Sequence, residues 1–104
     1  MRSVPEATLV AIQERFHAVI RERAAELTEQ QMLDLPELAP LLSSNDPKAW
    51  FSVPGMYGGF SYWFEGEGET AKLVTESWSR IVDGSGQRHE ITAQGSQLVD
   101  QGFV

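Results

Sequence analysis

Three residues in the C-terminal half of the chain carry side chains that could do chemistry together, namely Glu76, Arg80 and His89. A histidine beside a carboxylate is the usual pair for general acid–base catalysis, if a cleft holds both groups and shifts their pKa values. With a further carboxylate such as Asp100, the same histidine could hold a metal ion. The alternative is structural, because charges on the core side of a sheet must be paired. We favour a salt-bridged rim that fixes the strand register.

These three residues meet only if the strands pair in one particular register. A four-residue Asp-Gly-Ser-Gly turn would pair Arg80 with His89, and the EGEGE turn would pair Phe60 with Val74. Cross-strand partners share a face of a sheet, as do residues two positions apart. Beside the three polar residues, the expected core face contains six large apolar side chains: Phe60, Tyr62, Phe64, Val74, Trp78 and Ile91.

Other chemical motifs are weaker. The Gly-Ser-Gly segment lacks the third glycine or the lysine of a phosphate-binding loop, and Asp-Gly is a strong hairpin-turn signal. Ser77 and Ser79 are close to His89 in sequence but are expected to face away from it. The chain has two histidines and no cysteine, and His17 is expected on the surface of a helix. We therefore expect no metal site and no other cofactor.

The helices that must support the sheet are predicted from apolar spacing. Before residue 45, apolar residues recur every three or four positions, which predicts a helix over about 4–29 with Ser3 as its N-cap. Asp34 is expected to open a second, short helix, and Asp46 a further turn that carries Trp50.

From residue 57 onward, the pattern alternates as strands do, with short turns between the runs. Strands are predicted at 60–64, 70–82, 87–93 and about 98–99. The predicted fold class is α+β, with N-terminal helices (one long, one or two short) packed on one face of an antiparallel meander sheet of about four strands. We expect a single domain over 1–104, with a helical half at 1–52 and the sheet at 57–104.

The segment PGMYGG at 54–59 joins the two halves. A Pro-Gly turn followed by two glycines predicts a bulge or a close approach of two backbones. The functional alternative is a flexible lip over a binding pocket. Tyr57 would then be a contact, and Tyr57 and Tyr62 could both reach the polar group. Trp63 is expected on the solvent-exposed face beside Leu73, where it would anchor a protein contact or a homodimer.

The composition limits the partners. The 104 residues carry a net charge of -7, which argues against nucleic acid as the partner and weakly favours a basic protein. The N-terminus lacks the apolar run of a signal peptide, and no segment is apolar for long enough to span a bilayer. We therefore expect a cytoplasmic protein without membrane contact.

Two stretches, WFSVPGMYGGFSY at 50–62 and ESWSRIVDGSGQRHEIT at 76–92, together resemble a set of small uncharacterised bacterial cytoplasmic proteins with no known activity. The match covers the C-terminal half of the chain. The resemblance implies a bacterial cytoplasmic origin and implies no catalytic residues.

The expected function is that of a small binding or interaction module for a protein or a small molecule. One alternative is a ligand-binding pocket or small enzyme centred on Glu76, Arg80 and His89. Another is an acidic inhibitor or immunity-type protein that neutralises a basic enzyme through its carboxylates.

Overall fold

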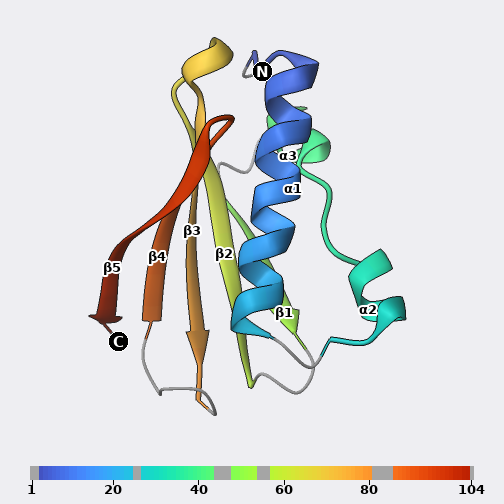
Figure 1. Ribbon diagram of the computed structural model, residues 1–104, viewed down its shortest axis with the longest axis vertical. Coiled ribbons are helices and arrows are strands. Elements are labelled where there is room, and N and C mark those ends of the chain that lie inside the picture. Colours follow the sequence, from blue (N-terminus) through green and yellow to red (C-terminus); the bar gives the residue numbers. More distant parts are fainter. Residues whose placement is uncertain (1–2, 25–26, 44–47, 54–56, 81–85, 104) are drawn as a thin grey trace.

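The computed structural model describes residues 3–24, 27–43, 48–53, 57–80 and 86–103. Within these ranges, three helices precede five strands: α1 (Glu6–Arg23), α2 (Glu29–Leu33), α3 (Ala39–Ser43), β1 (Ala49–Val53), β2 (Gly58–Glu65), β3 (Lys72–Ser79), β4 (Gly86–Thr92) and β5 (Gly95–Phe103). The strands form one antiparallel sheet in chain order. α1 crosses one face of the sheet, and α2 and α3 lie beside it (Figure 1). The predicted α+β class is confirmed, although the sheet has five strands instead of about four.

The first helix forms because its apolar residues recur at helical spacing and lie on the sheet. Ile12, Phe16 and Ile20 are each fully buried. α1 ends at Arg23, so the predicted extension to residue 29 is wrong. Ser3 is not the N-cap; its carbonyl oxygen instead accepts a hydrogen bond of 2.8 Å from the Gly68 N–H.

One short helix was predicted from Asp34 through Leu38, Leu41 and Leu42, whereas the structure has α2 before Asp34 and α3 after Leu38. Thr28 and Gln31 form a capping box at the start of α2, in which each side chain bonds the backbone N–H of the other residue. Asp34 therefore lies at the end of α2 and does not open a helix. Leu35 and Leu38, which follow it, pack in the core as part of a connecting segment.

The third helical prediction fails at Trp50, which lies in strand β1. Alternate residues of β1, including Phe51 and Val53, point toward the helices and are partly or fully buried. The sheet thus begins within the predicted helical half, at Ala49. The proposed cap Asp46 and the Pro54-Gly55 turn lie outside the described residues.

The strand register differs from the predicted one and exchanges the two faces of β3. Phe60 pairs with Ser77 instead of Val74, and His89 pairs with Thr75 instead of Arg80. The predicted strand began at Thr70, but Thr70 belongs to a short 3-10 turn at Gly68–Thr70, and β3 starts at Lys72. The partner of Phe60 is displaced by three residues, from Val74 to Ser77. Because three is an odd number, the β3 side chains that were predicted on one face of the sheet lie on the other.

The core lies between the helices and one face of the sheet. Its members from the sheet are Val53, Phe60, Tyr62, Phe64, Leu73 and Ile91. The rings of Phe16 and Phe60 pack edge to face, with their centroids 6.4 Å apart. Val74, Glu76 and Trp78, which were predicted on this face, instead point to the opposite one. We call that opposite face, on which no described helix packs, the open face.

The expected close approach at the two glycines is confirmed. A Cβ atom on Gly58 would overlap the carbonyl oxygen of Trp78. Both glycines pair regularly with β1 and β3, so no bulge is needed there.

Candidate interaction face

The open face displays three tryptophans on three neighbouring strands. Trp50 on β1 is 60% exposed, whereas Trp63 on β2 and Trp78 on β3 are half-buried. Val74 lies directly across from Trp63 and is only 3% exposed, although no described helix covers it. Large neighbours on the open face, such as Trp63, therefore shield Val74 from solvent.

The indole of Trp50 lies over the backbone of the next strand. A Cβ atom on Gly59 would be 2.7 Å and 2.9 Å from two carbons of the Trp50 ring. Gly59 also pairs with Trp78, whose other partner is Gly86. Glycines beside both rings leave space for the indoles to lie close to the sheet.

Trp63 is held by two polar groups. Its indole N–H donates a hydrogen bond of 3.2 Å to Glu65. The Lys48 ammonium lies 4.4 Å from the centroid of its ring, which is a favourable cation–π distance. Trp63 was predicted on the exposed face, and that placement is confirmed, but its neighbour there is Val74 and not Leu73.

Two groups of ion pairs also lie on the open face. The Arg88 guanidinium donates two hydrogen bonds to one Glu76 oxygen, at 3.0 Å and 2.6 Å. Lys72 bonds Glu90 at 2.8 Å and lies 3.7 Å from Glu65. Hydrogen bonds with Glu76 and Glu90 raise the pKa values of Arg88 and Lys72, respectively. The charges on this face are therefore matched locally.

The predicted group of Glu76, Arg80 and His89 does not assemble. Glu76 lies on the open face with Arg88, whereas His89 lies beneath α1 on the other side of the sheet. Arg80 is exposed just beyond the end of β3, where its N–H bonds the carbonyl oxygen of Tyr57 at 3.3 Å. The three residues are separated because the register of β3 differs from the predicted one. This difference moves the side chains of β3 to the opposite face and leaves those of β2 and β4 where they were predicted.

His89 has different polar neighbours from those predicted. It is 8% exposed, and α1 brings Arg23 and Glu22 close to it. Burial lowers the pKa of His89; Glu22 opposes that shift and Arg23 adds to it. Arg23 is itself buried and donates a hydrogen bond of 2.9 Å to the Ser77 hydroxyl. A polar group near the core does exist, and its charged members come from the helix.

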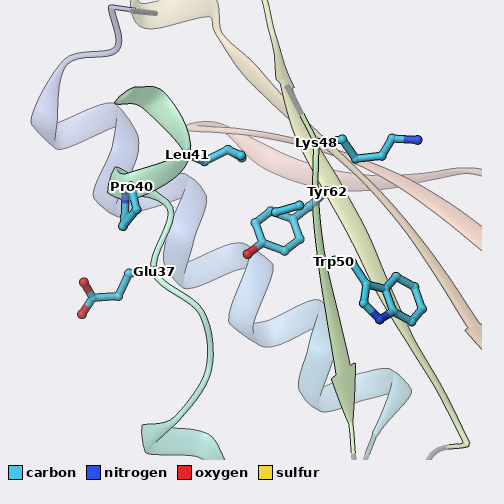
Figure 2. Close-up of a pocket in the computed structure, with 7 residues that line it drawn as sticks. Glu37, Pro40, Leu41, Lys48, Trp50 and Tyr62 are labelled. Carbon is cyan, nitrogen blue, oxygen red and sulfur yellow. The ribbon is translucent and has the colours of Figure 1, made fainter. Parts of the chain in front are cut away.

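The two candidate tyrosines are in very different settings. Tyr57 is 68% exposed and has a φ of 53°, a left-handed conformation that is uncommon for an aromatic residue. Tyr62 is 6% exposed, and its ring packs 5.0 Å from that of Phe16. Tyr62 also borders a cavity of about 340 Å3 between β1 and the α3 segment (Figure 2).

The sequence interpretation missed Trp50 and the cavity beside it. Both depend on Ala49–Val53 forming an edge strand, and the Asn-Asp-Pro at 45–47 was interpreted as a helix start. The available signal was the run Ala-Trp-Phe-Ser-Val, which is rich in aromatic and β-branched residues that favour strands.

No protein-family model matches the chain, and no curated protein and no solved structure matches it. In the described part of the chain, no helix has both the length and the apolar character that crossing a membrane requires. The same residues contain no cluster of three or more His, Asp or Glu side chains suited to a metal ion. Evidence for function therefore comes from the surface itself.

Proposed function

We propose that this chain is a cytoplasmic binding module that docks a basic protein on its open face. The observation that carries the proposal is the group of three tryptophans on a sheet face where no described helix packs, with Trp50 60% exposed. Tryptophan is strongly enriched among the residues that dominate binding energies at protein interfaces.

The charges support a basic partner. The ion pairs of the open face are matched among themselves, so they contribute orientation more than net attraction. The net charge of -7 on the whole chain would steer a positively charged protein toward it. A partner that is a basic enzyme would make the module an acidic inhibitor.

Quantitative capture from the native lysate tests the proposal. We compare the wild-type chain with Trp50→Ser and with Val10→Ser, which alters an exposed apolar residue on α1. One basic protein should be recovered with the wild type and with Val10→Ser, and its recovery should fall about tenfold or more with Trp50→Ser. Equal recovery with all three chains would refute the proposal. If the capture recovers only this chain, and analytical ultracentrifugation shows dimers, the open face binds a second copy of the chain instead of a basic protein.

A further inference from the structure

The two edge strands of the sheet differ in how regularly they pair. β1 pairs with β2 residue for residue, from Ala49 to Val53. β5 pairs with β4 with two irregularities, which leave Val99 and Gly102 outside the one-to-one register. Bulges of this kind disrupt an edge strand and protect it from pairing with another chain. β1 is therefore the edge that is suited to accept a further strand.

The backbone of β1 is available on its outer side. Alternate residues of an antiparallel edge strand direct their N–H and C=O groups away from their partner. Among the described residues, no backbone hydrogen bond joins β1 to an element other than β2. An extended segment placed there would satisfy these groups, as in the recognition of peptides by strand addition.

A cavity lies beside this edge. Its walls are formed by seven residues: Glu37, Pro40, Leu41, Lys48, Ala49, Trp50 and Tyr62. In Figure 2 the Tyr62 hydroxyl points across the cavity toward the segment that carries Glu37 and Pro40. The volume of about 340 Å3 is at the lower end of the range for ligand sites, which suits a large apolar side chain.

The charged groups beside the cavity determine which kind of side chain an added strand could place next to it. Glu37 is exposed, and among the described residues it takes part in no ion pair. Lys48 does not neutralise it, because its ammonium lies over the Trp63 ring and points away from Glu37 (Figure 2). Glu37 thus offers an unmatched negative charge at the rim.

We infer that β1 binds an extended segment of the partner as a sixth strand. One large apolar side chain of this segment enters the cavity over Tyr62. An arginine or lysine two positions away bonds Glu37, because residues two apart in a strand share a face. The inference rests on the proposed function in one respect, that the partner is a basic protein.

Synthetic peptides test this directly. The probe is acetyl-Thr-Val-Thr-Leu-Thr-Arg-Thr-amide, in which leucine and arginine share a face, and its comparison peptide has glutamate in place of arginine. Titration of the 15N-labelled chain should shift the β1 amides in NMR spectra. It should also slow hydrogen exchange at alternate β1 residues, which a side chain that only fills the cavity would not do.

A matched pair of variants tests the charge. Glu37→Lys and Glu14→Lys change the net charge equally, and Glu14 lies on the exposed side of α1. Glu37→Lys should weaken binding of the arginine peptide roughly three- to tenfold and strengthen binding of the glutamate peptide. Glu14→Lys should change neither by more than about 1.5-fold.

Each other outcome overturns the inference. Shifts without exchange protection in β1 would show a cavity ligand and no added strand. Shifts confined to the indole signals of Trp63 and Trp78 would place the peptide on the open face, leaving the proposed function intact. Absence of any shift at millimolar peptide would rule out strand addition, while the lysate experiment decides the proposed function independently.

Discussion

Replacing Ser77 by alanine should destabilise the fold through the buried Arg23. The Ser77 hydroxyl is 2% exposed and accepts a hydrogen bond of 2.9 Å from the Arg23 Nε–H, and Arg23 is 7% exposed. A hydrogen bond to a charged group contributes about 1.5–3 kcal/mol, and loss of the acceptor leaves a desolvated donor. We therefore expect Ser77→Ala to lower the free energy of unfolding by about 1.5–3 kcal/mol.

Urea denaturation followed by tryptophan fluorescence measures this loss, provided that the m-value is unchanged. Ser61→Ala is the matched control, because Ser61 lies on the adjacent strand with its side chain on the open face. It should change stability by less than about 0.5 kcal/mol. In an Arg23→Met background, the cost of Ser77→Ala should also fall below about 0.5 kcal/mol. A loss that is equal in both backgrounds would refute the assigned pair.

Three further predictions follow from burial and geometry. Phe60→Ala should cost about 3–5 kcal/mol in urea denaturation, whereas Trp50→Ala should cost under about 1 kcal/mol because its ring is 60% exposed. Gly58→Ala should lower the melting temperature clearly more than Gly95→Ala, because a Cβ at Gly58 would overlap the backbone of Trp78 and one at Gly95 would meet nothing within 4 Å. Burial lowers the pKa of His89 below its unfolded value of 6.5, so its contribution to stability should be complete above pH 6.5 and decline as the pH falls below that value. His89→Gln should remove that part of the pH dependence.

Each of these three predictions has an outcome that would contradict it. Equal losses for Phe60→Ala and Trp50→Ala would reverse the assignment of the two faces. Equal melting temperatures for the two glycine variants would deny the close approach at Gly58. For the pH dependence, NMR titration measures the midpoint of His89; if that midpoint is not below 6.5, burial does not control the protonation of His89.

The α+β class, the long first helix and the strands after residue 57 could be predicted from periodicity. Residues of α1 such as Ile12 and Phe16 recur at helical spacing, and the alternation after residue 57 fits strands joined by short turns. Both signals are local. The position of α2 was also in the sequence, since Thr28 and Gln31 make a capping box that competes with the similar pattern at Asp34.

The faces of β3 could not be predicted from hydrophobicity. Leu73 and Val74 are adjacent, and both are buried, so the strand has no clean alternation. Hydrophobicity favours Trp78 in the core over Ser77, but the structure has the opposite arrangement. The small Ser77 lies beneath the helix, where Arg23 gives it a partner, and Trp78 lies between two glycines on the open face. The positions of Ser77 and Trp78 thus depend on contacts with residues that are distant in sequence, which local hydrophobicity does not reveal.

The contact surface is most directly tested by photocrosslinking from single positions. We replace Trp50, on the open face, or Val10, on α1, with p-benzoylphenylalanine and irradiate cells that express the chain. We predict that position 50 gives a covalent adduct with one basic protein and that position 10 does not. An adduct with the same protein from position 10 but none from position 50 would contradict the central claim that the open face binds the partner.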